Sequence, residues 1–305
     1  MIKPMDLSGL RTISLHERPG KVAIADFAPT YKPGAKLMSL FPPLLAGNSF
    51  RKIIEAIVDA KRAGKPVLWG IGGHVIKCGL APVLLDLMHR GFATSFSMNG
   101  SAAIHDYEIA LCGSTSEDVE SVLPDGRFGS AEETGRLMNT AIQPGLGLGE
   151  AYCASLKSTP FAEHSLLSQA GRAGVPVTVH VAIGTDTPHT HPAINPAALG
   201  AATHHDFRLF CTLVSQMNEG GVYLNVGSAV IMPEVFLKAI SAVRNLGHPL
   251  ANFTTANFDF LQHYRPRMNV VDRPHAGSGG KGYSITGHHE LMIPLLAMAL
   301  REAEA

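Results

Sequence analysis

The sequence predicts an α/β fold with a doubly wound, mostly parallel sheet covered by helices on both faces. Helix-period segments alternate with short runs rich in β-branched residues, those runs are apolar throughout, and small residues follow several of them. This combination is typical of a Rossmann-like sheet. With 305 residues, of which 46% are hydrophobic, the chain can bury a substantial core. No repeat or composition break divides it, so we expect residues 1–305 to form one domain.

Each expected element has a local cause. The first helix opens with a capping Ser49, places Ile53 and Ile57 on one face, and stops at Gly64. A proline, Pro82, should interrupt the helix that follows the first strand. The expected elements in order are helix 49–64, strand 65–71, helix 74–91, strand 92–98, a mostly helical middle, strand 174–183, helix 196–217, strand 221–227, helix 232–247, strand 251–259 and helix 289–303.

Composition narrows the function classes. Lys+Arg and Asp+Glu are balanced at 25 each without a charged run, which argues against nucleic acid or an anionic membrane as a partner and favours a small molecule. The N-terminus has no apolar signal core, and the four cysteines show no CxxC spacing, so we expect a cytoplasmic protein whose cysteines are buried apolar residues. "LMIPLLAMAL" near the C-terminus is too short to span a bilayer and predicts a core helix.

Small or polar residues follow most of the expected strands. In parallel sheets, ligands bind beyond the carboxyl ends of the strands, where such residues let backbone amides approach a phosphate. We therefore expect these strand exits to converge on one edge and enclose a nucleotide-sized cleft. The exits are Gly70, Gly72 and Gly73 after the first strand, Asn99 and Gly100 after the second, Asp186 after the third, Gly227 and Ser228 after the fourth, and Thr254, Thr255 and Ala256 with the last.

The glycine-rich loops do not match common nucleotide fingerprints. "GSGGKG" has the wrong glycine spacing for a P-loop and places Gly282 where a P-loop needs Ser or Thr. "GLGLGE", residues 145–150, is GxGxG rather than GxGxxG and follows no clear strand. A dinucleotide would have to be bound in another way.

The order of several segments resembles the blocks of deoxyhypusine synthase. These segments are "GIGGHVIKCGLAPVLLDLMHRGFATSFSMNGSAAIHDYEIAL", "GVPVTVHVAIGTD", "HHDFRLFCTLVSQMNEGGVYLNVGSAV", "FTTANFDF" and "LMIPLL", and together they cover roughly residues 45–300. The resemblance implies a Rossmann-like NAD-binding domain, a homotetramer, and active sites at dimer interfaces. That family oxidises spermidine with NAD and passes an aminobutyl group through a lysine imine to a lysine of a translation factor.

The resemblance also implies roles for particular residues. Asp106 or Glu108 falls where the family has an acid near cofactor and amine, and Lys281 corresponds to the lysine that forms the imine. The implied amine substrate is of polyamine type. The residues implied to contact NAD are Gly73, His74, Val75, Ile76, Asn99, Gly100, Asp186, Gly227, Ser228, Thr255, Ala256 and His288.

Lys281 can attack a carbonyl or imine carbon only as the neutral amine. That form requires a lowered pKa, which burial or a neighbouring cation can provide. Arg267, Arg273 and nearby histidines are candidate cations. The alternative is a solvated lysine on a flexible glycine loop, and such a loop can also act as a lid.

A second class of function is a metal-dependent hydrolase. His180, His189 and His191 lie at and beyond the end of the third expected strand, close to Asp186, and "THHDF" follows at 203–207. Imidazoles with a carboxylate suit Zn, Fe or Mn, although no fixed metal-binding spacing is present. A third class is a non-catalytic nucleotide-binding scaffold, because "VIMPEV" replaces the histidine pair of the family.

The segment 112–135 is acidic and rich in loops. Its simplest interpretation is a solvated surface or a subunit contact. The alternative is that its carboxylates contact a cationic amine; these are Glu117, Asp118, Glu132 and Glu133.

Overall fold

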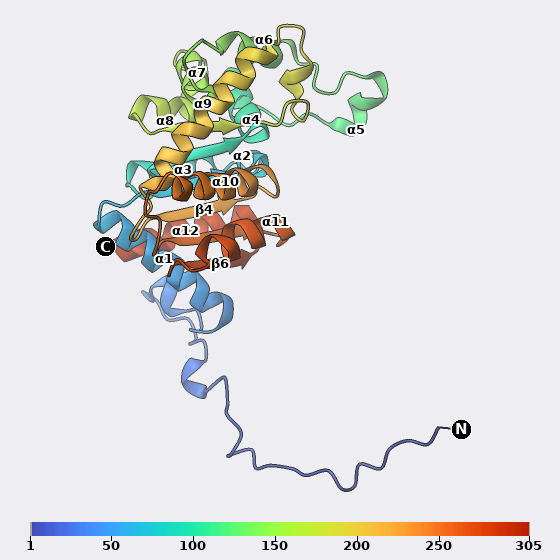
Figure 1. Cartoon of the computed structure of the whole chain (residues 1–305), viewed down its shortest axis with the longest axis vertical. Helices are drawn as coiled ribbons and strands as arrows, with labels where there is room; N and C mark the ends of the chain where they lie inside the picture. Colours follow the sequence, from blue (N-terminus) through green and yellow to red (C-terminus); the bar gives the residue numbers. More distant parts are fainter. Residues whose placement is uncertain (1, 305) are drawn as a thin grey trace.

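The computed structural model describes residues 2–304 and confirms the α/β class. Its sheet has six strands, all parallel, in the order β3-β2-β1-β4-β5-β6 (Figure 1). This is the doubly wound, Rossmann-like order, in which the chain reverses direction across the sheet between β1 and β4. The strands are β1 Val67–Ile71, β2 Ser95–Asn99, β3 Val177–His180, β4 Val222–Val226, β5 Thr254–Asp259 and β6 Lys281–Thr286.

Helices pack on both faces of the sheet. In β1, Trp69 belongs to the apolar cluster formed with α1, α3, α4, α8 and α12, whereas Leu68 belongs to the cluster formed with α9 and α10 on the other face. The helices are α1 Leu45–Arg62, α2 Gly73–Lys77, α3 Ala81–His89, α4 Gly100–Cys112, α5 Val119–Val122, α6 Glu132–Ala141, α7 Leu148–Ser155, α8 Leu166–Ala173, α9 Pro196–Ser215, α10 Ile231–Asn245, α11 Tyr264–Pro266 and α12 His289–Glu304.

The helix expected over residues 74–91 is interrupted as predicted. Gly79 adopts a left-handed φ of 73°, and Pro82 lies in the first turn of α3, where its missing N–H is not needed. The chain therefore forms a short α2 directly at the exit of β1. This break places the side chains of α2 at the carboxyl edge of the sheet.

One strand was not predicted. β6 lies at the edge of the sheet, and Ile285 is its only buried residue. A strand with so little buried surface lacks the apolar run that indicates a strand in the sequence.

The two ends of the chain differ in how far they are buried. The segment from Ile2 to about Lys36 is almost wholly exposed and leads away from the body of the molecule (Figure 1). At the other end, α12 buries Ile293, Leu296 and Leu300, which confirms the predicted core helix. No helix within residues 2–304 has the length and apolar character needed to cross a bilayer.

Candidate active site

Four of the five expected exits lie at the carboxyl edge of the sheet. Asn99 ends β2, Gly73 and Gly227 closely follow β1 and β4, and Asp186 lies in the loop after β3. Because all strands are parallel, these residues share one edge.

The fifth exit was placed wrongly. Thr255 and Ala256 are the second and third residues of β5, so they lie toward its amino end. Thr255 is fully buried, and its hydroxyl donates to the Val270 carbonyl and contacts His275 Nε2. These residues stabilise the sheet interior, and the structure does not bring them to the other exits.

Lys281 is also on the opposite edge. It is the first residue of β6, paired with Thr254 at the amino end of β5, and it is exposed. The five residue steps from Lys281 to Thr286 at the carboxyl end span roughly 16 Å of extended strand. The expected meeting of Lys281 with the glycine exits is therefore corrected, because the residue begins a strand instead of following one.

The crevice between the β1 and β4 exits is filled by protein atoms. A Cβ at Gly72 would lie 2.0 Å from the Gly227 carbonyl oxygen, and a Cβ at Gly227 would lie 3.1–3.2 Å from His289 and Val75 atoms. Val75 and Ile76 point into the apolar core. Close packing of the two exits therefore explains why glycine occupies positions 72 and 227.

The other positions expected to hold phosphate are occupied as well. A Cβ at Gly100 would lie 2.1 Å from Asp186 Oδ2, so this carboxylate lies against the first turn of α4, where an anion is favoured. Ser228 is buried, and its Oγ accepts a hydrogen bond from Met232 N. The residues present do not fit a dinucleotide phosphate at these exits, and we derive no chemical step from NAD.

A cavity of about 230 Å³ lies beside α4 at the same edge, and we call it the α4 cavity. α2, α4, α6 and the loops before α6 and after β3 enclose it. On α4, Ser101, His105 and Glu108 are spaced by four and three residues and so share one helix face. Its polar lining includes Lys77, Ser101, His105, Glu108, Glu117, Thr134 and Asp186.

His105 and Glu108 are linked through a threonine. The Thr115 hydroxyl donates to Glu108 Oε2 and lies 2.7 Å from His105 Nδ1, while Thr134 donates to Glu108 Oε1 over 3.1 Å. Since Thr115 gives its only proton to the carboxylate, His105 Nδ1 must carry a hydrogen and donate it. His105 Nε2 then presents a lone pair, and no hydrogen bond within residues 2–304 uses it.

His105 is uncharged at neutral pH. Burial, together with the nearby Lys77 ammonium, lowers the pKa of His105 to about 4. A neutral imidazole accepts a hydrogen bond from a cation without repelling it. Such a weak base cannot readily deprotonate an alkylammonium, whose pKa is about 10. Its role toward a cationic ligand is therefore recognition.

The charges in the cavity favour a cation. Glu108, Glu117 and Asp186 contribute carboxylates, and Lys77 is the only lysine in the lining. Glu117 Oε2 accepts the Gly129 amide over 2.9 Å, which orients its carboxylate, and burial raises the pKa of Asp186. The acidic segment 112–135 thus contributes Glu117 to a cavity. In contrast, Glu132 is exposed and pairs with Arg136 and His191.

Asp106 is a structural residue. It is completely buried and accepts hydrogen bonds from Ser165 Oγ, Leu166 N and Leu167 N at 2.6–2.8 Å, at the start of α8. Burial raises the pKa of Asp106 to about 6 despite these three donors. It does not line the cavity that Glu108 lines, so of the two candidate acids only Glu108 reaches the α4 cavity.

The three histidines considered for a metal do not converge. His180 is buried in the sheet against Phe210 and contacts Thr178 Oγ1, His189 Nδ1 accepts amides of its own turn, and His191 bridges Glu132 and Ala193. Local hydrogen bonds therefore account for them. In the described chain, the group of His, Cys, Asp and Glu side chains that could hold a metal is a different one, formed by His74, Cys78 and Glu290.

The remaining predictions concern His288 and the cysteines. His288 follows β6 at the carboxyl edge, is exposed, and stacks on Phe260 at 6.0 Å between ring centroids. Only Cys153 is buried; Cys112 is exposed, and Cys78 and Cys211 are partly buried, so the expectation of four apolar core cysteines is wrong for three of them.

Sequence reasoning missed Lys77 and His105 as cavity residues. Both lie within the segments that resemble deoxyhypusine synthase, but neither residue belongs to the glycine-rich loop or is one of the small residues that mark a strand exit. The available signal was the spacing of Ser101, His105 and Glu108 along a helix that begins at a strand exit.

The fold is shared with several solved structures at low sequence identity. AgrE, solved with ornithine and NAD+, has a TM-score of 0.56 at 13% identity; the match covers 85% of this chain and 33% of AgrE. A LOR/SDH protein candidate from Methanococcus maripaludis has a TM-score of 0.53 at 14% identity, covering 92% and 74% of the two chains. A deoxyhypusine synthase candidate from Entamoeba histolytica has a TM-score of 0.52 at 12% identity, covering 90% and 96%.

These matches establish structural similarity to deoxyhypusine synthase-like and LOR/SDH proteins. No protein-family model and no curated protein matches the sequence. The chain spans about a third of the length of AgrE.

Proposed function

We propose that this protein is an enzyme of the deoxyhypusine synthase-like fold group that binds a small cationic amine in the α4 cavity. The observation that carries the proposal is the charge of the cavity, where three carboxylates oppose one lysine. A ligand with two or more ammonium groups would neutralise this excess. The resemblance implies transfer or NAD-dependent oxidation of this amine; an oxidation would need NAD+ as the hydride acceptor, and the cavity residues themselves account for binding of the amine.

Each cavity residue has a role in this proposal. Glu108 and Glu117 pair with the ammonium group, and His105 Nε2 accepts one of its hydrogens. The threonine link between His105 and Glu108 keeps that lone pair available. Lys77 adds a cation at the α2 side, which would pair with a carboxylate if the ligand is a basic amino acid.

The structural neighbours support the class of ligand. AgrE has been solved with ornithine, a basic amino acid, and the Entamoeba histolytica protein is described as a deoxyhypusine synthase candidate. Lys77 should distinguish a basic amino acid, which has a carboxylate for it to pair with, from a polyamine, which has none. Replacing Lys77 by Ala should weaken ornithine binding and leave putrescine binding equal or tighter.

Binding of NAD is tested separately from binding of the amine. AgrE was solved with NAD+, which would supply a hydride acceptor for an oxidation. In this chain, Gly72, Gly227 and Asp186 fill the positions expected for its phosphates. Titrating NAD alone and after saturation with the amine tests whether a dinucleotide contributes, because only the second titration would show heat if the amine opens a site.

Calorimetric titration of the purified protein with putrescine, spermidine and ornithine tests the proposed function. We expect at least one of them to bind, and Glu108→Gln with Glu117→Gln to abolish that binding. Glu163→Gln is the matched control, because Glu163 is exposed, pairs with the neighbouring His164 and does not line the cavity. Absence of binding by all three amines would favour a non-catalytic scaffold.

A further inference from the structure

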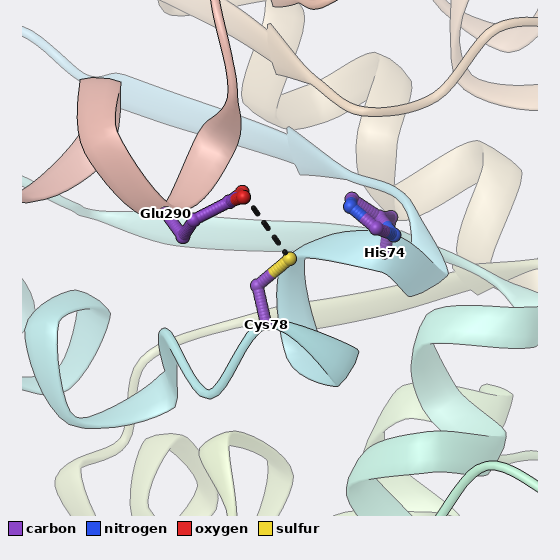
Figure 2. Close-up of side chains that lie close together, drawn as sticks. All are labelled: His74, Cys78 and Glu290. Carbon is purple, nitrogen blue, oxygen red and sulfur yellow. Dashed lines mark hydrogen bonds between the residues drawn. The ribbon is translucent and has the colours of Figure 1, made fainter.

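A second group of chemically reactive side chains lies at the carboxyl edge, on α2 and at the start of α12. Figure 2 shows His74 of α2 and Cys78, the residue that follows α2, close to Glu290 of α12. One ligand atom from each residue lies within 4.8 Å of the other two. None of these residues lines the α4 cavity.

The local structure explains why they meet. His74 lies in the first turn of α2 and Cys78 is the C-cap that follows the helix, four residues on, so their side chains share one face. The exits of β1 and β6 both open at the carboxyl edge, which brings the start of α12 to α2. Two segments far apart in sequence order, α2 with its C-cap and the start of α12, therefore supply a nitrogen, a sulfur and an oxygen to one place.

The spacing of sulfur and oxygen suits a tetrahedral metal. Cys78 Sγ lies 3.6 Å from Glu290 Oε2. Zinc bonds of about 2.3 Å to sulfur and 2.0 Å to oxygen at a tetrahedral angle separate those two ligands by roughly 3.5 Å. The mixed set of thiol, imidazole and carboxylate is one that Zn²⁺ accepts, whereas Mg²⁺ and Ca²⁺ prefer oxygen alone.

His289 provides an independent observation beside this group. Its side chain is 1% exposed, and its ring centroid lies 5.5 Å from that of His74. Its Nε2 donates to the Phe258 carbonyl at 3.2 Å, so its Nδ1 carries a lone pair, and that atom is buried with no hydrogen-bond partner in the described structure. A backbone carbonyl holding one imidazole nitrogen while the other remains free is the usual arrangement around a metal-binding histidine.

We propose that His74, Cys78 and Glu290 form a zinc site, with the fourth position taken by water. A metal bound there would join α2 to the start of α12 and so fix the helix that carries Lys77. Binding converts the Cys78 thiol to a thiolate and releases its proton to solvent, with no change of oxidation state.

Metal content and cobalt spectroscopy test the site on the full chain. After saturation with Zn²⁺ and gel filtration, mass spectrometry should find one zinc per chain. Replacing zinc by Co²⁺ should produce the thiolate-to-cobalt charge-transfer absorption, which requires a cysteine ligand. Both signals should be lost in Cys78→Ser and kept in Cys112→Ser, whose cysteine lies on an exposed part of α4.

Two further variants separate ligand loss from misfolding. Glu290→Gln and His74→Ala alter exposed side chains, so both proteins should fold, as their circular dichroism will show. Each should weaken zinc binding by about 10-fold or more. A wild-type chain without zinc or the cobalt band, or a Cys78→Ser variant that retains them, would overturn the proposal. Amine binding is tested separately by calorimetric titration, because none of the three proposed zinc ligands lines the α4 cavity.

Discussion

Glu108 is the residue on which amine recognition should depend most. Both of its carboxylate oxygens are held by threonine hydroxyls, so it is oriented before any ligand arrives. Replacing Glu108 by Gln keeps the shape and removes the charge. We expect amine affinity to fall by about 10-fold or more, since a hydrogen bond to a charged group contributes about 1.5–3 kcal/mol. Calorimetric titration measures the change, and unaltered affinity would remove Glu108 from the site.

His105 should leave a signature in the pH dependence of stability. Its pKa is lowered from 6.5 to about 4 in the folded protein. Between these two pH values His105 is protonated in the unfolded chain and neutral in the folded protein. The contribution of neutral His105 to the free energy of unfolding is therefore complete above pH 6.5 and is lost as the pH falls through 4. The loss is at most about 3 kcal/mol.

The variant His105→Gln isolates this contribution. Urea unfolding of both proteins at about pH 7 and about pH 4.5 should show a steeper loss of unfolding free energy on acidification in the wild type than in the variant. Both proteins contain the other buried histidines, so their contributions to the pH dependence cancel in the comparison. One of them is His180, and burial lowers its pKa to about 3. Equal losses in the two proteins would show that His105 is not held neutral by the fold.

Among the secondary-structure elements, α8 depends on Asp106. This carboxylate accepts three hydrogen bonds at the start of the helix, and Asp106→Ala would leave three donors buried without a partner. We expect the free energy of unfolding to fall by about 3 kcal/mol or more. Denaturant unfolding measures this loss. Because Asp106 does not line the α4 cavity, amine affinity of the folded variant should remain, and a selective loss of binding would contradict the structural role.

The elements also show what the sequence could and could not predict. Buried strands such as β1 and β4, and long helices such as α10, have apolar patterns that mark them clearly. β6 has a single buried residue and no such pattern. Because the sequence does not reveal β6, it predicts Lys281 in a loop after β5, near the carboxyl edge of the sheet. In the structure Lys281, the predicted nucleophile, begins β6 at the amino edge.

Candidate site residues were predictable only in part. Glu108, Glu117 and Asp186 were named from the resemblance or from acidic patterning. Lys77 and His105 were not, because their convergence depends on how α2, α4 and the loop before α6 fold around one cavity. The glycines at the strand exits do not by themselves indicate a phosphate site. Close packing of two exits requires glycine at such a position just as phosphate binding does.

At the scale of the whole molecule, the contact between the β1 and β4 exits joins the two halves of the sheet. A Cβ at Gly72 would lie 2.0 Å from the Gly227 carbonyl oxygen, so Gly72→Ala must separate the exits. We expect a loss of about 3 kcal/mol or more, or failure to fold. Gly200→Ala is the control, because nothing lies within 4 Å of its Cβ position in α9, and it should stabilise the protein slightly.

Thermal unfolding of the two glycine variants gives the comparison. A normal melting temperature for Gly72→Ala would mean that the exits can separate easily, which would reopen the crevice to a dinucleotide. The homotetramer implied by the family resemblance remains a proposal at this scale. Light scattering after gel filtration would determine the number of chains.

Calorimetric titration of spermidine, putrescine and ornithine into the wild type and the Glu108→Gln, Glu117→Gln double variant is the most direct test of amine recognition by the α4 cavity. The expected result is binding of at least one amine by the wild type and by Glu163→Gln, with no detectable heat from the double variant. Equal affinity in all three proteins would place the amine elsewhere and contradict the assignment of this cavity.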